Sequence, residues 1–131
     1  MDIVAALFTE SFNMRQVAGP STRLDLTGVY FSMAAPSAVP VTIEPHLVVL
    51  VRCGFDEPGT GVLETVYRRD GEQVARNAQP VTVEPGRFGY RLVRAELAFE
   101  DDYGTVEAHV RVDQGHTTVV PLTLLPPARE N

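Results

Sequence analysis

Short runs of strand-forming residues, separated by turn-forming residues every eight to fifteen positions, constrain this chain more than any other feature. No apolar repeat of about 3.6 residues is sustained anywhere along its 131 residues. Such spacing is typical of β-sandwiches and barrels rather than of alternating strands and helices. We therefore expect an all-β fold, a two-sheet immunoglobulin-like β-sandwich of about eight antiparallel strands.

The expected strands alternate apolar and polar residues, or are continuously apolar, and are bounded by turn-forming residues. They cover residues 3–9, 23–33, 46–52, 62–69, 72–78, 88–99, 105–112 and 117–125. The segment 34–45, rich in small residues and proline, is expected to form a long ordered loop or an extra edge strand. Together the runs predict a single domain over residues 1–125 and a flexible tail over residues 126–131.

Turn residues and a phase change add detail to this pattern. Asp70-Gly71 lies between two strand-like runs and predicts a hairpin with a type I′ turn, because both central residues of that turn need positive φ. Gly28 interrupts its run and is compatible with a β-bulge. The apolar residues of run 88–99 change face midway, which predicts a bulge or a strand that passes from one sheet to the other. Pro121 marks an edge strand or a bulge, because proline donates no hydrogen bond to a neighbouring strand.

Residues 46–52 are apolar on both faces of the expected strand. One face carries Leu47, Val49 and Val51, and the other carries Val48 and Leu50. A strand without a polar face is normally central in its sheet and covered on both sides. Its outer face therefore needs a cover, either a loop or another subunit. The leading functional hypothesis is a non-catalytic protein-interaction module that self-associates through this apolar face.

The net charge of −6 comes from 17 acidic residues and 11 basic residues, all of them arginine. Nucleic acids and anionic membranes are bound by basic surfaces, so neither is expected as a partner. The apolar N-terminal run is short and carries Asp2 where a signal peptide has positive charge. No run reaches the roughly 18 apolar residues of a membrane-spanning helix. The expected setting is cytoplasmic, with a protein partner or a second copy of the chain.

Carboxylates in the loops are the candidates for a metal site. Glu100, Asp101 and Asp102 lie between two expected strands, and Ca²⁺ binds roughly six to eight oxygen atoms of the kind that such loops supply. If each strand crosses the sandwich once, loops alternate between its ends, and loop 100–102 lies at the same end as Asp70. The carboxylates expected at the opposite end are Asp56, Glu57 and Asp113. Calcium or small-ligand binding through Glu100, Asp101 and Asp102 is the alternative function, although no D-x-D spacing supports it.

The other residues that carry chemistry do not form a known catalytic pattern. His46, His109 and His116 lack the spacing of a metal site, and a zinc site needs at least three converging donors. Cys53 is the single cysteine, so it forms no intramolecular disulfide and is expected to behave as a small, half-buried apolar residue. No G-x-S-x-G sequence is present, and a phosphate-binding P-loop needs the lysine that this chain lacks. We predict no catalytic residues, no metal and no cofactor, and an enzyme is the third hypothesis.

Two stretches resemble a known family. One runs from Glu10-Ser11-Phe12-Asn13 through Leu24-Asp25-Leu26-Thr27-Gly28-Val29-Tyr30 to Pro40 and residues 46–52, and the other runs from Tyr103 to Gly115. They resemble the opening strands and the closing hairpin of a family of uncharacterised bacterial β-sandwich domains, immunoglobulin-like and of unknown function. The resemblance implies a short first strand, a turn and a second strand with a Leu-x-Leu-x-Gly sequence. It implies the fold and a bacterial source, and it transfers no catalytic residue, because the family carries no established activity.

Overall fold

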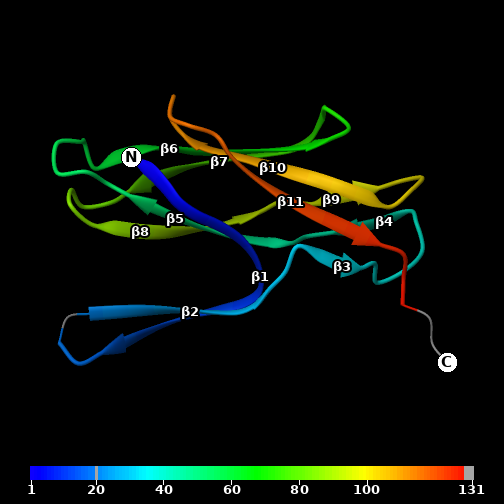
Figure 1. The fold of residues 1–131 in the computed structure, drawn as a ribbon, viewed down its shortest axis with the longest axis horizontal. Coiled ribbons are helices and arrows are strands. Elements are labelled where there is room, and N and C mark those ends of the chain that lie inside the picture. The colour runs from blue at the N-terminus through cyan, green and yellow to red at the C-terminus, as the bar shows by residue number, and fades with distance from the viewer. Residues whose placement is uncertain (20, 129–131) are drawn as a thin grey trace.

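The computed structural model describes residues 1–19 and 21–128, which form eleven strands and no helix (Figure 1). The strands are β1 (Asp2–Val17), β2 (Ser21–Val29), β3 (Ser32–Ala34), β4 (Val41–Ile43), β5 (His46–Arg52), β6 (Thr60–Arg69), β7 (Glu72–Thr82), β8 (Phe88–Arg94), β9 (Leu97–Phe99), β10 (Gly104–Val112) and β11 (Thr118–Leu125). The expected all-β class is confirmed. None of the described segments is a helix that is long and apolar enough to cross a membrane.

The strands form three sheets. A four-stranded sheet has the order β2-β1-β5-β8, a five-stranded sheet has the order β3-β11-β10-β6-β7, and β4 pairs with β9. Figure 1 shows the two larger sheets as stacked layers, with the β1–β2 hairpin below them. Among the described pairings, that of β3 with β11 is parallel and the others are antiparallel.

The core lies between the two larger sheets. Val49 of β5 belongs to the same buried cluster as Leu63 and Tyr67 of β6, and all three side chains are fully buried. On β10 the buried residues alternate with more exposed ones, as predicted, and they are Val106, Ala108, Val110 and Val112. This alternation fixes the register of β10, because a slip of one residue would turn its apolar side chains to solvent.

Strand β5 has the bounds and the place that its apolar sequence predicts. It lies between β1 and β8, so both of its edges are paired. Leu47 and Val49 on its inner face are fully buried, and Val48 on its outer face is only 1% exposed. Strand β5 is therefore central in its sheet, and its outer face is buried at Val48 and half-buried at Leu50.

The strand count and one pairing differ from the expected set of about eight antiparallel strands. The expected strand 23–33 divides, because the chain leaves the four-stranded sheet after Val29 and β3 then joins β11 in parallel. Segment 34–45 contributes β4. Run 88–99 divides into β8 and β9, so its phase change marks a strand that passes between sheets. Strands β3, β4 and β9 have three residues each, which is too short for a period of two to be recognised.

Strand β1 is longer than the expected 3–9. It continues to Val17, because Phe12 and Met14 alternate with polar neighbours and extend the period of two. Strand β7 likewise extends beyond residue 78. The first half of β1 pairs with β5 as far as Thr9, and the second half pairs with β2.

The predicted hairpin turn is confirmed, with φ of 52° at Asp70 and 80° at Gly71. The bulge expected at Gly28 is wrong: its φ is 66°, but the β1–β2 register is the same before and after it. Register shifts occur instead near Ile3 in β1 and near Tyr67 in β6. Gly28 thus adopts a positive φ within β2 without inserting an extra residue.

Pro121 lies on the last strand, β11, where the sequence predicts an edge or a bulge. Strand β3 pairs with β11 only at residues 123–125. At Pro121, β10 is therefore the one described strand that pairs with β11, and the other side of β11 is an edge. Such an edge position tolerates proline. Residues 126–128 have no regular secondary structure. The rest of the predicted flexible tail, residues 129–131, lies outside the described residues.

Candidate interaction site

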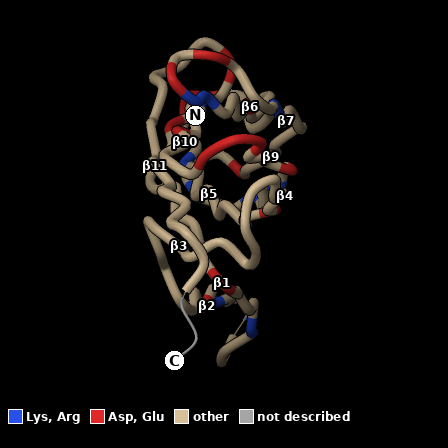
Figure 2. Tube along the Cα trace, turned by 90° about the vertical axis from the view of Figure 1, so that its right-hand side faces the viewer, with Lys and Arg blue, Asp and Glu red and all other residues tan. Residues whose placement is uncertain are grey.

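The second half of β1 and the whole of β2 form a hairpin that extends away from the two layers. Residues 10–17 and 21–29 of this hairpin are named the arm. Cross-strand partners point to the same side of a sheet, so the register assigns the apolar side chains of the arm to one face. They are Phe12, Met14, Leu24 and Leu26. Figures 1 and 2 show the arm at the bottom of two perpendicular views, apart from the strands of the layers.

The opposite face of the arm is polar. Arg15 Nε donates a hydrogen bond to Asp25 Oδ2 at 2.7 Å, and both side chains are about half exposed. Arg15 lies directly across the strands from Arg23, so the ion pair runs diagonally along the hairpin. The arm is therefore an amphipathic hairpin, with an apolar face and a charged face.

The outer face of the four-stranded sheet is apolar where the arm approaches it. The register forms two cross-strand rows, Leu7-Val48-Leu92 and Ala5-Leu50-Tyr90. The rings of Phe12 and Tyr90 lie 6.3 Å apart, centroid to centroid, at an interplanar angle of 60°. Aromatic rings attract each other at this separation. Phe12 of the arm therefore partly covers the outer face, on which Val48 lies outside the main core cluster.

This cover is incomplete. Met14 is 50% exposed, and Leu24, Leu26, Leu50 and Tyr90 are half-buried. Apolar surface left in water costs roughly 25 cal/mol per Å² relative to burial. Both sides of the contact between arm and sheet therefore keep apolar surface that a partner would bury.

The arm leaves the body of the protein at Glu10 and Gly28. Gly28 has a positive φ of 66°, and a Cβ placed on it would lie 2.5 Å from Glu10 Oε2. Residues with a side chain rarely adopt this conformation. The positive φ therefore favours glycine at the root of the arm, whereas the exposed side chain of Glu10 could move aside for a Cβ.

The edge strands of the two larger sheets are protected from further pairing to different extents. Strands β7 and β8 are bridged by side chains: Gln79 Nε2 donates to the carbonyl oxygen of Leu92 at 3.1 Å, and Arg91 Nε donates to that of Pro80 at 3.3 Å. Strand β3 has only three residues. Strand β2 has nine residues, contains no proline, and has no other described strand on its outer side. The edge of β2 thus offers backbone donors and acceptors for pairing.

A cleft of about 500 Å³ lies at the root of the arm. Its lining includes Thr9, Glu10, Tyr30, Glu44 and His46. Thr9 is 1% exposed, and no described residue accepts from or donates to its Oγ1. Burial and the nearby Glu10 carboxylate raise the pKa of the Tyr30 hydroxyl. The cleft is therefore acidic and rich in hydrogen-bonding groups.

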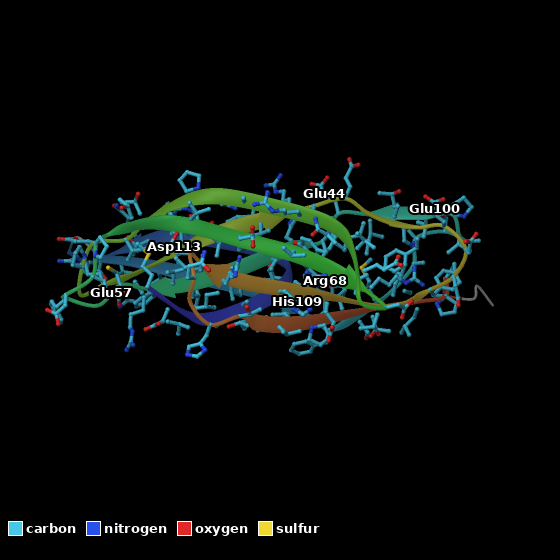
Figure 3. All side chains as sticks on the ribbon, turned by 90° about the horizontal axis from the view of Figure 1, so that it is seen from above. Glu44, Glu57, Arg68, Glu100, His109 and Asp113 are labelled. Carbon is cyan, nitrogen blue, oxygen red and sulfur yellow. The ribbon has the colours of Figure 1, made fainter. Side chains whose placement is uncertain are left out.

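A second polar cluster covers the outer face of the five-stranded sheet, where Figure 3 shows Arg68 and His109. Glu64 Oε2 accepts from Arg76 Nη2 at 2.7 Å, and Arg111 Nη2 lies 3.2 Å from Glu64 Oε1. The hydrogen bond from Arg76, with the charges of both arginines, holds the pKa of Glu64 below its usual value. This cluster links β7, β6 and β10 and is explained by the pairing of its own charges.

The calcium candidates Glu100, Asp101 and Asp102 lie in the loop between β9 and β10. Figure 3 shows Glu100 at the opposite end of the molecule from Glu57 and Asp113, in agreement with the alternation of loops expected from the sequence. The two acidic groups are therefore too far apart to share an ion.

The carbonyl oxygen of Asp102, at the end of loop 100–102, already has a cationic partner. Arg69 Nη2 donates to the carbonyl oxygens of Asp102 at 3.0 Å and Tyr103 at 2.7 Å, and the guanidinium lies 4.8 Å from the centroid of the Phe99 ring. Asp102 Oδ1 accepts a hydrogen bond from the backbone N–H of Tyr103 at 2.7 Å. Within residues 1–19 and 21–128, no three His, Cys, Asp or Glu side chains are grouped to hold a metal ion.

The remaining candidates are dispersed. His46 lies on β5, His109 on β10 and His116 in the loop before β11. Cys53 is fully buried rather than half-buried, and its thiol lies 3.5 Å from the carbonyl oxygen of Gly54. The cysteine thus packs as a small apolar residue, as its sequence context suggests.

The arm is the feature that sequence analysis misses, because the expected first strand ends at residue 9. The signal that identifies it is the alternation of Phe12 and Met14 with Ser11, Asn13 and Arg15. The cleft is missed as well, because its lining residues come from segments that are distant in the sequence.

Neither a scan against models of known protein families nor a search of curated proteins finds a match to this chain. Function is therefore inferred from the geometry of the arm, the edge of β2 and the cleft.

Proposed function

We propose that this protein is a non-catalytic protein-interaction module whose binding element is the arm. The observation that carries this proposal is the incompletely covered apolar face of the arm, where Met14 is half exposed. Apolar side chains gathered on one face and left in water are typical of binding surfaces. A partner that covers this face buries the arm and the neighbouring outer face of the four-stranded sheet together.

The proposal includes an immunoglobulin-like β-sandwich as the fold class and a cytoplasmic setting in a bacterium. Two observations support the fold class: two stacked sheets whose pairings are antiparallel except for that of β3 with β11, and the resemblance of residues 103–115 to a closing hairpin. A buried single cysteine and the absence of disulfides among the described residues suit a reducing compartment.

Native mass spectrometry of wild type and Met14→Glu, purified gently from the cells that make the protein, tests the proposal. We expect the wild-type chain to carry a second polypeptide, either another copy or a different protein. Met14→Glu should release it, because a carboxylate would have to be desolvated at the interface. The matched control is Val74→Glu on β7, a residue of similar exposure at 44%, which should keep the partner. A wild-type spectrum of monomer alone, or a partner that survives Met14→Glu, contradicts the proposal.

Small-ligand binding is the second candidate, favoured by the unpartnered Thr9 hydroxyl in the cleft at the root of the arm. The carboxylates of Glu10 and Glu44 suit a polar cation, such as a diamine. A ligand bound only by the folded state raises the melting temperature. Putrescine should therefore raise the melting temperature of wild type and not that of Glu44→Gln, and equal melting temperatures with and without putrescine contradict this candidate.

A further inference from the structure

We infer that the partner of the arm is a second copy of this chain, joined by antiparallel pairing of β2 with β2 about a two-fold axis. The two four-stranded sheets then become one continuous sheet across the dimer. This inference rests on the proposed function and names the partner.

The first argument is the contrast among the sheet edges. Exposed edge strands are normally protected by proline, by charged side chains, by short length, by bulges or by a covering segment. Strands β7 and β8 bridge each other through Gln79 and Arg91, and β3 is short. Strand β2 is long, and its pairing with β1 continues without a register shift. Among the edges of the two larger sheets, β2 is thus the one built to accept another strand.

The second argument is that the two faces of the arm restrict the register. Directly opposed residues of an antiparallel pair point to the same side of the sheet. A register that set Arg23 opposite Leu24 of the partner subunit would place the charged face of one arm beside the apolar face of the other. Registers centred on a residue, rather than between two residues, keep the apolar faces together.

The third argument is charge complementarity. Centring the axis on Leu24 places Arg23 opposite Asp25 of the partner subunit, and symmetry repeats this pair. Centring it on Arg23 or on Asp25 would instead set identical charges opposite each other, which is destabilising. The charges of β2 therefore favour the register in which Leu24 faces Leu24 of the partner subunit.

The fourth argument is the burial of apolar surface. In this register Leu24 faces Leu24 of the partner subunit, so each half-buried Leu24 gains an apolar neighbour on the same face of the extended sheet. Figures 1 and 2 show the arm outside the two layers, where a second molecule can approach its edge.

Sedimentation equilibrium of the full chain and of three charge variants tests the register. We expect wild type to dimerise, and Arg23→Asp or Asp25→Arg each to weaken the dimer about tenfold or more, because like charges then oppose each other twice. The double variant restores opposite charges and should return the dissociation constant to within about threefold of wild type. Position 23 lies across from Arg15, so the double variant keeps an intramolecular partner for Arg15. Thermal melting near the wild-type temperature shows that each variant is folded.

Disulfide trapping gives a second measure of the same register. Leu24→Cys should form a cross-linked dimer on oxidation, because opposed Cβ atoms lie roughly 4.5–5.5 Å apart. Leu26→Cys is the matched control and should remain uncrosslinked, since its counterparts are offset by four residues, roughly 13 Å along the strand. The native Cys53 is buried and does not compete.

The outcomes separate this inference from the proposed function. The wild-type chain could stay monomeric at every concentration and yet carry a different polypeptide that Met14→Glu releases. This result would contradict the proposal that the partner is a second copy, but it would agree with the proposed interaction module. A dimer that withstands both single charge variants, or that cross-links through Leu26→Cys in preference to Leu24→Cys, overturns the register. A partner unaffected by Met14→Glu contradicts the proposed function itself.

Discussion

Replacing Tyr67 by phenylalanine removes a buried hydroxyl group that has no hydrogen-bond partner among the described residues. The side chain is 0% exposed and lies in the main core cluster, so bulk water does not reach it. Leaving a buried polar group unpaired costs about 1–3 kcal/mol. Phenylalanine keeps the ring and its packing, so Tyr67→Phe should increase the free energy of unfolding by about 1.5 kcal/mol. With about 2.1 cal/mol/K of unfolding entropy per residue, this gain raises the melting temperature of a 131-residue chain by about 5 °C.

Urea denaturation and calorimetry of two further variants provide the comparison. Thr65→Val, on the same face of β6, removes another fully buried hydroxyl for which the described residues offer no partner, and it should stabilise the fold as well. Tyr103→Phe should have the opposite effect, because the Tyr103 hydroxyl accepts a hydrogen bond from the N–H of Val39 at 3.2 Å. We expect that change to destabilise the fold by about 1 kcal/mol. A loss of stability of similar size in Tyr67→Phe would refute the reasoning.

The same residue makes a prediction about alkaline pH. Burial raises the pKa of the Tyr67 hydroxyl above its usual value of about 10, because the charged form is disfavoured in the core. The unfolded chain then loses this proton at a lower pH than the folded protein. The stability associated with neutral Tyr67 is therefore complete below about pH 10 and is lost as the pH rises further. Melting temperatures of wild type should fall more steeply above about pH 10 than those of Tyr67→Phe, and parallel curves would contradict this assignment.

Three further predictions concern the root of the arm, the charged cluster around Glu64 and loop 100–102. Gly28→Ala should lower the free energy of unfolding by about 1–2 kcal/mol in urea denaturation, because alanine is strained at a φ of 66°, and an unchanged value would show that the arm relaxes freely. Glu64→Gln should make stability depend less on pH in the acid range. Because the pKa of the Glu64 carboxyl is lowered by Arg76 and Arg111, its contribution to stability is present above about pH 4.5 and is lost as the pH falls. Identical losses of stability in wild type and Glu64→Gln below that pH would contradict a stabilising role of these ion pairs. Calcium at about 1 mM should leave the melting temperature unchanged from that in chelator, because Arg69 already donates to the carbonyl oxygens of Asp102 and Tyr103. A rise of several degrees would restore the calcium hypothesis.

Strong local patterns were sufficient to predict the central strands. The continuous apolar run of β5 predicts both its position between two neighbours and the burial of Val48 on its outer face. The alternation in β10 and the Asp70-Gly71 turn depend on local chemistry alone, and both are present as predicted. In these segments, the local sequence alone is sufficient to predict the structure.

Features that depend on tertiary contacts were not predictable in this way. The three-residue strands β3, β4 and β9 form because distant partners supply their hydrogen bonds, as β11 does for β3. The cleft joins Thr9, Glu44 and His46 through the pairing of β1 with β5. The arm has a visible alternation, but its polar residues outnumber its apolar ones and it lies outside the core, so composition does not distinguish it from a loop.

Hydrogen–deuterium exchange of the wild-type protein at low and high concentration tests the central role of the arm most directly. Amide hydrogens that become paired or buried on association exchange more slowly. We predict that peptides covering residues 21–29 gain protection as the concentration rises, while those of β7 and of loop 100–102 stay unchanged. Protection that does not change in the arm, or that appears in β7 or loop 100–102 instead, would contradict the assignment of the arm as the element through which this protein binds a second copy.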